Sequence, residues 1–274
     1  MKKSICYLFV LVLISSFANN SFSQSISAVT AEESKPENST EYLVGATVWY
    51  QTSAECDALY NQIYSLAKMK LEFSLKNSKV KKKKAIVTDL DETVIDNSPF
   101  QARLIKNNFD YSEKEWNIWV NEKNAKALPG SVSFFNYAQE NGVEVFYISN
   151  RSIETINETM ENLRNLGLPF VDEKHVLLKK ESSDKSDRIK KVNSSFDLVL
   201  LLGDNLRDFS EEYANRGDDF GKQKVEETKQ LFGEKYIVFP NPMYGEWEKA
   251  VYKNERDVSN EKKNILRKEA LNIK

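Results

Sequence analysis

Five short apolar runs, four of which end in polar or charged residues, constrain the fold of this chain most strongly. Helical stretches separate the first four, and the fifth follows later in the chain. The runs are Ala85–Leu90, Val143–Ser149, Val176–Leu178, Leu198–Leu202 and Tyr236–Phe239. Apolar strands that alternate with helices are typical of a parallel sheet covered on both faces. We therefore predict an α/β fold with a doubly wound parallel sheet, whose ligands bind beyond the carboxyl ends of the strands.

Polar residues follow each of the first four runs, where such a sheet would bind its ligand. Alone, each group is typical of a turn or a helix cap. Together they fall at the ends of four strands of one sheet, so we expect them to converge at its edge. They are Asp89 and Asp91, then Ser149 and Asn150, then Lys185, and finally Asp204 and Asp208.

This set of side chains suits phosphoryl transfer. Clustered carboxylates repel one another unless a cation lies among them, and hard oxygen ligands suit Mg²⁺. Ser149, Asn150 and Lys185 would supply donors and positive charge to an anionic phosphate ester. One carboxylate can attack phosphorus, and a second, two residues further on, can act as general acid and then base.

Ordered motifs give the chain a family resemblance. The chain resembles the haloacid dehalogenase (HAD) phosphohydrolases in four ordered motifs, which are DLDET, SNR, a downstream lysine and GDNLRDF. DLDETVIDNSPF, WVNEKNAKALPGSVSFFNYA, VFYISNR, SDKSDR and LLGDNLRDF resemble the class C acid phosphatases, specifically the bacterial lipoprotein e family of 5′-nucleotidases. The similarity runs from about Ala46 to about Glu255. It implies a HAD-like, Rossmann-like sheet with a small helical cap, formed by residues 45–78 and 100–126, and a C-terminal helix over 247–274.

The resemblance also implies roles for the carboxylates. Asp89 would be the nucleophile and a metal ligand, and Asp91 the acid/base, which also gives its backbone carbonyl to Mg²⁺. Asp204 would be the third metal ligand, and Asp208 would hold a metal-bound water or the loop. An acidic pH optimum is expected, because Asp91 must be protonated to help the leaving group depart.

The remaining assignments concern the substrate. Ser149 and Lys185 would bind phosphate, with Asn150 close by. Trp116 and Tyr244 match the aromatic positions that stack on the nucleotide ring in the family. Core packing is the alternative for Trp116, since Trp119 lies three residues away on the same helix face.

The N-terminus is typical of an export signal. Lys2 and Lys3 precede an apolar stretch over 5–17 and a small-x-small site at 21–23. We expect a signal peptide over 1–23, a polar linker over 24–44 and a single phosphatase domain over 45–274. No lipobox cysteine stands at the end of the signal, so the sequence favours a periplasmic or secreted enzyme over a lipid-anchored one. No other stretch is apolar enough to cross a membrane.

The amino-acid composition limits the kinds of ligand that the protein can bind. The chain has 39 basic and 41 acidic side chains, so no strongly basic surface for a nucleic-acid polymer is expected. One histidine, His175, excludes phosphatases that need a phosphohistidine plus a second His, and multi-histidine metal hydrolases. The expected partner is a small phosphomonoester. Because relatives form dimers, a homodimer remains open.

The sequence thus predicts an exported, Mg²⁺-dependent acid phosphatase that acts on phosphomonoesters, chiefly 5′-nucleotides or nicotinamide mononucleotide. A non-catalytic nucleotide- or haem-binding protein on the same scaffold is the alternative, which the intact Asp89 disfavours. A serine hydrolase built on Ser65 and Lys68 lacks the companion motifs of that class. A structural protein would depend on neither Asp89 nor a metal.

Overall fold

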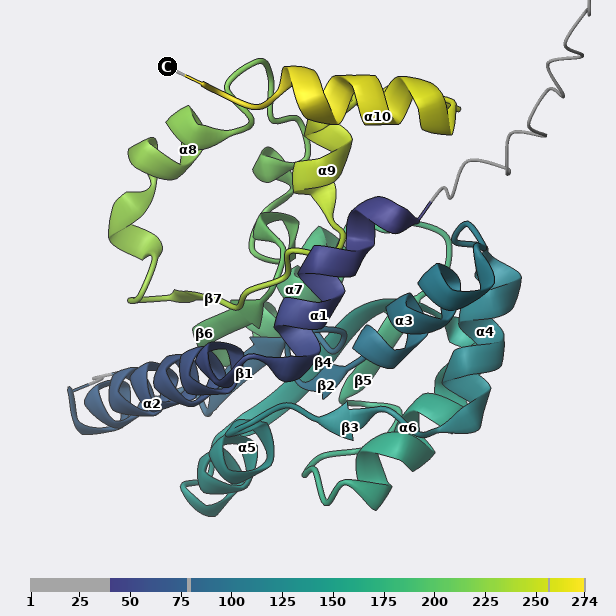
Figure 1. Cartoon of the computed structure of the whole chain (residues 1–274). Coiled ribbons are helices and arrows are strands. Elements are labelled where there is room, and N and C mark those ends of the chain that lie inside the picture. The colour runs from purple at the N-terminus through teal and green to yellow at the C-terminus, as the bar shows by residue number, and fades with distance from the viewer. Residues whose placement is uncertain (1–39, 78–79, 256, 274) are drawn as a thin grey trace, which may run out of the picture. The chain divides into compact units, whose positions relative to one another are not determined.

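The central sheet has five parallel strands in the order β5-β4-β1-β6-β7 (Figure 1). The computed structural model describes residues 40–77, 80–255 and 257–273. The strands are β1 (Lys84–Thr88), β4 (Glu144–Ser152), β5 (Val176–Lys179), β6 (Asp197–Gly203) and β7 (Tyr236–Val238). Each coincides with one of the predicted apolar runs, within a few residues at the ends. The strand order reverses direction at β1, which places the centre of the sheet beside Asp89.

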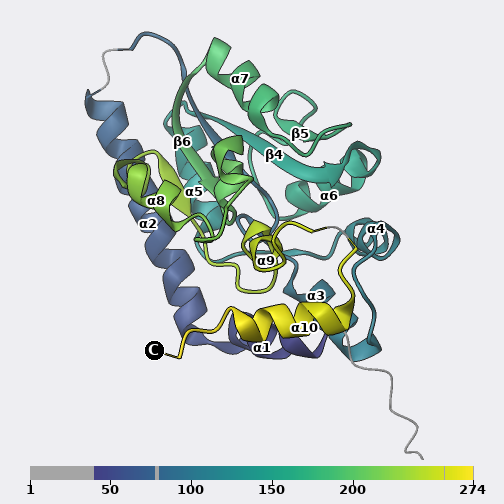
Figure 2. The same cartoon turned by 90° about the horizontal axis from the view of Figure 1, so that it is seen from above.

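Successive side chains along each strand point to opposite faces of the sheet, so the protein has two separate hydrophobic cores, one on each face. Ile86 and Leu200 belong to the larger core, whereas Val87 and Leu201 belong to the smaller one. The larger core packs against α2 (Ala54–Asn77), α5 (Ser131–Glu140) and α6 (Ile156–Asn165), and the smaller against α7 (Ser186–Ser195). Seen from above, β6 lies between α2 and α7 (Figure 2). Both faces are therefore covered, as a doubly wound sheet requires.

The remaining elements lie around the carboxyl edge of the sheet or connect its strands. They are α1 (Val44–Thr52), α3 (Ser98–Asn107), α4 (Glu113–Glu122), α8 (Lys222–Glu227), α9 (Glu246–Val251), α10 (Asn260–Glu269), the small sheet of β2 (Ile95–Asp96) and β3 (Lys126–Ala127), and the 3₁₀ turns η1 (Glu41–Leu43), η2 (Ile153–Thr155), η3 (Leu206–Asp208), η4 (Glu211–Tyr213) and η5 (Lys229–Leu231). α4 begins where Ser112 caps it, by accepting a hydrogen bond from the backbone N–H of Glu115. No helix within these described ranges is both long and apolar enough to span a membrane.

Two predicted boundaries differ from the structure. Residues 41–44, expected at the end of the linker, form η1 and the first residue of α1, and Leu43 is buried. Of the segment 45–78, expected as part of the cap, α2 packs on the sheet, where Tyr60 and Leu71 are fully buried. The predicted signal peptide and most of the linker lie outside the described residues.

The predicted C-terminal helix is two helices. α9 and α10 are separated by a bend in which Lys253, Asn254 and Asp257 have positive φ. α10 does not extend away from the domain, since its Leu266 is buried and its Arg267 guanidinium lies 3.3 Å from the centre of the Tyr42 ring. α10 and η1, which are far apart in the sequence, therefore pack together.

Candidate active site

The loop after β1 places Asp89 beside the end of β6. The backbone N–H of Asp89 donates to the carbonyl of Leu202, at 2.9 Å, and Asp204 follows two residues later. The carbonyl of Leu90 accepts from the backbone N–H groups of Val94 and Ile95, which closes a tight turn. The predicted convergence of the first and fourth strand ends is therefore present.

Three carboxylates meet at this point. Oxygens of Asp89, Asp204 and Asp208 lie within 4.8 Å of one another, and no other group of metal-binding side chains was found among the described residues. Asp208 reaches the cluster because η3 folds back, with its Oδ2 accepting from the backbone N–H of Asn205 at 3.0 Å. Gly203 is required here, since a Cβ would come within 2.5 Å of Asp208 Oδ2.

Lys185 lies among these carboxylates. Its Nζ contacts Asp89 and lies 2.8 Å from Asp208 Oδ1, and the side chain is 4% exposed. Burial lowers the pKa of Lys185, but the charges of Asp208 and Asp89 outweigh it and raise that pKa above its ordinary value. The lysine at the third strand end thus keeps its positive charge next to Asp89.

One ammonium does not balance three carboxylates. Burial raises the pKa of Asp89, and the charges of Asp208 and Asp204 add to this against the charge of Lys185. Burial and the charge of Asp208 likewise raise the pKa of Asp204 to about 7. Hard oxygen donors with this excess of negative charge fit a divalent cation.

Asp91 lies in a different set of contacts. Its carboxylate accepts hydrogen bonds from Arg151 Nη2 at 2.8 Å, from Asn97 Nδ2 at 2.9 Å and from Ser149 Oγ at 3.2 Å. Its side chain is thus outside the group formed by Asp89, Asp204 and Asp208. The sequence-based assignment used only its backbone carbonyl for the metal, and that role stays a prediction.

Sequence reasoning missed several residues that position the carboxylates. Arg151 completes SNR and Asn97 stands in DNSPF, so the motifs contained both but gave neither a role. Asn241 donates to Asp204 Oδ2 at 2.8 Å from the loop after β7, and Thr93 Oγ1 lies 3.5 Å from Asp204 Oδ1. Only the carboxyl end of the fifth run could have pointed to Asn241.

Ser149 and Asn150 differ in exposure although they are adjacent. Ser149 is fully buried and also accepts from the backbone N–H of Arg151. Asn150 is exposed, and its Oδ1 accepts from Arg188 Nη2 at 2.8 Å. Both line the same cavity as Asp89 and Lys185.

The two tryptophans of α4 have different surroundings. Trp119 is buried and donates from Nε1 to Asn97 Oδ1 at 2.8 Å. Trp116 lines the cavity, packs edge-on against Phe100 with ring centres 5.1 Å apart, and has the Arg151 guanidinium 5.5 Å from its ring centre. Core packing thus describes Trp119 better than Trp116.

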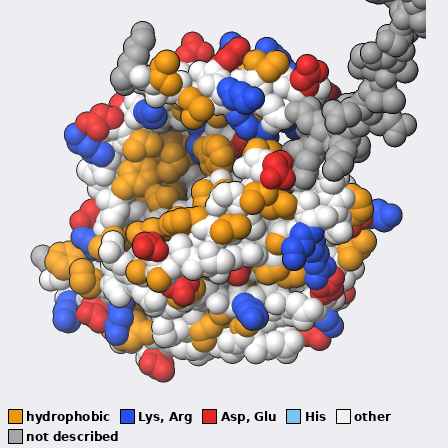
Figure 3. All heavy atoms as spheres, in the orientation of Figure 1, with side chains coloured by type: hydrophobic (Ala, Val, Ile, Leu, Met, Phe, Trp, Pro, Cys, Tyr) orange, Lys and Arg blue, Asp and Glu red, His pale blue; other side chains and the backbone are white. Residues whose placement is uncertain are grey.

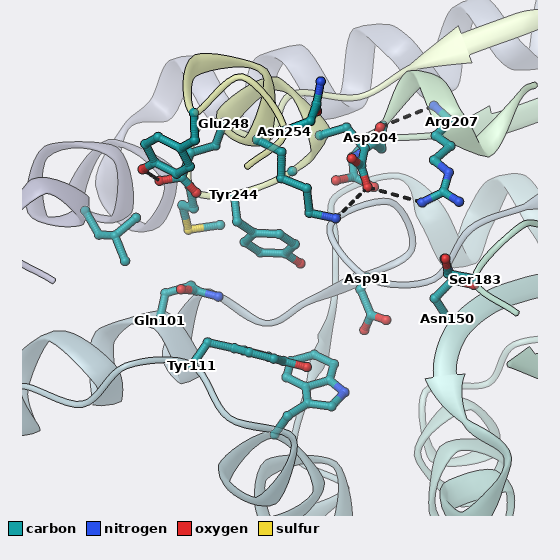
Figure 4. A pocket seen from close by; sticks show the side chains of 18 of the residues that line it. Asp91, Gln101, Tyr111, Asn150, Ser183, Asp204, Arg207, Tyr244, Glu248 and Asn254 are labelled. Carbon is teal, nitrogen blue, oxygen red and sulfur yellow. Dashed lines mark hydrogen bonds and ion pairs between the residues drawn. The ribbon is translucent and has the colours of Figure 1, made fainter. Parts of the chain in front are cut away.

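The cavity has a volume of about 1540 Å³ and extends from Asp89 to η1, α9 and α10. Tyr244 and Tyr111 face each other across it, with Asp91 beyond them (Figure 4). Charged side chains of both signs are interspersed over the face shown in Figure 3, which agrees with the near balance of acids and bases in the sequence.

His175 lies at the other edge of the sheet. Its ring nitrogens are each 2.7 Å from a carboxylate oxygen, of Asp172 and Glu144, and its side chain is 6% exposed. It does not line the cavity. The single histidine is therefore engaged in a structural cluster before β4 and β5.

Comparison with known proteins decides the family. The family model described as HAD superfamily, subfamily IIIB (acid phosphatase) matches residues 11–247, most of the chain. The chain belongs to this family. The structure of the class C acid phosphatase from Bacillus anthracis is similar to it, with a TM-score of 0.82 and 40% identity over 86% of this chain and 98% of that one. A class C acid phosphatase from Bacillus anthracis with tungstate bound has a TM-score of 0.82 and 41% identity, with the same coverage.

More distant relatives are plant proteins. The stem 31 kDa glycoprotein of Glycine max is 24% identical over 161 residues, which are 57% of each chain. The stem 28 kDa glycoprotein of Glycine max is 24% identical over 146 residues, 50% of this chain and 56% of that one. The chain thus spans little more than half the length of these curated relatives. The family, the α/β fold class and the class of enzyme, a HAD acid phosphatase, were predicted correctly.

Proposed function

We propose that this HAD acid phosphatase is a Mg²⁺-dependent enzyme that hydrolyses small phosphomonoesters, chiefly 5′-nucleotides or nicotinamide mononucleotide. The observation that carries the proposal is the position of Asp89. It is buried at the carboxyl end of the central strand, next to the Lys185 ammonium and within the group that contains Asp204 and Asp208. It also borders an open cavity large enough for a nucleotide.

Asp89 acts as the nucleophile. One of its oxygens attacks phosphorus, and the bond from phosphorus to the ester oxygen breaks, which leaves an aspartyl-phosphate. Asp91 gives a proton to the departing oxygen. In the second half, Asp91 takes a proton from the attacking water, and phosphate leaves Asp89 as a free carboxylate.

The residues around Asp89 stabilise the negative charge of the phosphoryl group and orient Asp91. Lys185 neutralises oxygens of the phosphoryl group, which carries negative charge throughout the reaction. Ser149 and Arg151 hold the Asp91 carboxylate towards the cavity through their hydrogen bonds. Asn150, at the rim, offers an amide to the phosphate.

A Mg²⁺ ion would be held by Asp89 and Asp204, with the backbone carbonyl of Asp91, while Asp208 would support the site directly or through water. The ion supplies a Lewis acid that neutralises the phosphoryl oxygens. The binding of tungstate, a tetrahedral oxyanion, to the similar enzyme from Bacillus anthracis supports an oxyanion site in this family.

The leaving group is bound by aromatic side chains. Trp116 and Tyr244 both line the cavity that contains Asp91. Stacking on a ring tolerates different bases, because every base has a π face. This supports a nucleotide or a pyridine ribotide as the substrate class.

Export and assembly are part of the same proposal. Residues 1–23 have the composition of a signal peptide, which would deliver the enzyme to the periplasm or the medium. Size-exclusion chromatography with light scattering would determine whether the protein forms a homodimer.

The test is phosphate release by the purified protein at mildly acidic pH. Adenosine monophosphate, nicotinamide mononucleotide and p-nitrophenyl phosphate are each assayed with Mg²⁺ and with EDTA. We expect turnover with Mg²⁺, a fall of at least about 100-fold with EDTA, and recovery on adding Mg²⁺. Folded protein that releases no phosphate from any of the three would contradict the proposal and favour a binding protein.

A further inference from the structure

Gln101 is a buried amide that faces the cavity. It lies on α3, is 6% exposed, and lines the same cavity as Asp89 and Trp116. Its side chain makes no hydrogen bond among the contacts between the described residues. Figure 4 shows it directed into the space between Tyr244 and Tyr111, with Asp91 at the far side of that space.

Although the side chain as a whole is buried, its amide N and O are not among the fully enclosed unpaired atoms of the described residues, so they are open to the cavity. A ligand in the cavity can therefore reach the amide. The neighbouring positions on α3 do not share this feature. Ser98 Oγ accepts from Gln51 Nε2 at 3.1 Å, and Phe100 and Leu104 are apolar and buried. The Gln101 amide is thus a polar group of α3 that faces the cavity and has no hydrogen-bond partner among the described residues.

The position of the amide suits an aromatic ligand with a polar edge. Tyr244 and Tyr111 present ring faces on both sides of the space that the amide enters. A ring held between them would place one edge towards Gln101, while its phosphate reaches towards Asp89. A primary amide offers one acceptor and one donor side by side, so it pairs best with an edge that carries both.

We propose that Gln101 is a specificity-determining residue, which selects phosphomonoesters whose leaving group carries a ring with a hydrogen-bond donor and an acceptor side by side on its edge, such as the lactam edge of hypoxanthine. The inference rests on the proposed phosphatase function and names the part of the substrate that this chain recognises. Rings without such an edge leave the amide unpaired, and sites built to form a hydrogen bond discriminate against ligands that lack it.

The experiment uses two substrates that differ only at that edge. Inosine 5′-monophosphate has the lactam N–H and C=O, and purine riboside 5′-monophosphate lacks both. We expect the wild-type protein to hydrolyse the first with a kcat/KM about tenfold higher than the second, the effect of one good hydrogen bond. In Gln101→Met, of similar length but without the amide, this ratio should fall to about one.

Two further variants complete the test. Gln101→Glu keeps the shape and one acceptor but loses the donor, so its ratio should fall between those of the wild type and Gln101→Met. Gln139→Met makes the same chemical change on the exposed surface of α5, outside the cavity, and should keep the wild-type ratio. Because each ratio is taken within one preparation, a general loss of folded protein does not affect it.

The possible results distinguish a failure of the Gln101 proposal from a failure of the proposed phosphatase function. A wild-type ratio near one, or an unchanged ratio in Gln101→Met, would overturn the role of Gln101. Hydrolysis of p-nitrophenyl phosphate without turnover of either nucleotide would also overturn it, yet leave the phosphatase function standing. Absence of turnover on all substrates would overturn both.

Discussion

The two edges of the sheet have different charge balances. At the carboxyl edge, three carboxylates, those of Asp89, Asp204 and Asp208, lie around the single ammonium of Lys185. At the amino edge, Glu144 contacts Lys83, Lys174 and His175, and Asp172 contacts the other ring nitrogen of His175. The first arrangement has negative charge in excess, whereas in the second each carboxylate has its own donors.

The pKa shifts follow this difference. Burial and like charges raise the pKa of Asp204 to about 7. Burial also pushes the pKa of Glu144 upwards, but hydrogen bonds from Lys83, His175 and Lys174 together outweigh it and lower that pKa to about 2. The carboxyl edge is therefore arranged to receive a cation and an anionic ester, whereas the amino edge is satisfied within the protein and contributes to stability.

Asp89→Asn should give the largest effect, because an amide is a far weaker nucleophile than a carboxylate. We expect kcat on p-nitrophenyl phosphate to fall by at least about 1000-fold. The variant should unfold at the wild-type temperature or above it, since one of three repelling charges is removed. Substantial activity in a pure sample would refute the assignment of the nucleophile.

Glu144→Gln tests the amino edge of the sheet. It should lower the stability of the protein and leave its activity unchanged, the opposite of Asp89→Asn. Loss of the shared carboxylate leaves Lys83, Lys174 and His175 without their common partner. We expect the free energy of unfolding at pH 7 to fall by about 2 kcal/mol, measured by urea denaturation. Its kcat should stay within about twofold of the wild type, and a large loss of kcat would show that the two edges are coupled.

The same pair of proteins gives a pH prediction. Because the folded pKa of Glu144 is lowered to about 2, its contribution is fully present above its unfolded pKa and is lost as the pH falls towards 2. The advantage of the wild type over Glu144→Gln should therefore shrink between pH of about 4.3 and 2, by at most about 1.4 kcal/mol per unit. Urea denaturation at several pH values would measure it. A constant advantage across this range would contradict the ion-pair explanation.

Trp116→Ala should give the smallest change and affects only the carboxyl edge. Losing one stacking face should raise KM for nucleotides by about fivefold. The KM for p-nitrophenyl phosphate should rise less, because its ring is smaller. Steady-state kinetics on both substrates decide the point, and equal effects would argue that Trp116 merely supports Phe100.

Much of this molecule could be predicted from local patterns. The apolar runs marked all five strands of the main sheet, and the polar residues after them supplied Asp89, Asp204 and Lys185. The start of the folded chain at η1 and the break between α9 and α10 were not predicted, because each depends on packing between the two ends of the domain, such as that of Tyr42 on Arg267.

The sequence by itself determined which residues reach the carboxyl edge, because strand alternation and strand ends are local properties. Only the tertiary structure decided what those residues touch. Arg151 pairs with Asp91 across 60 positions, and Asn241 with Asp204 across 37. Gln101 and Tyr244 face one cavity although they lie in different helical and loop segments. Such contacts depend on how distant elements pack, and neither periodicity nor motif spacing encodes that distance in space.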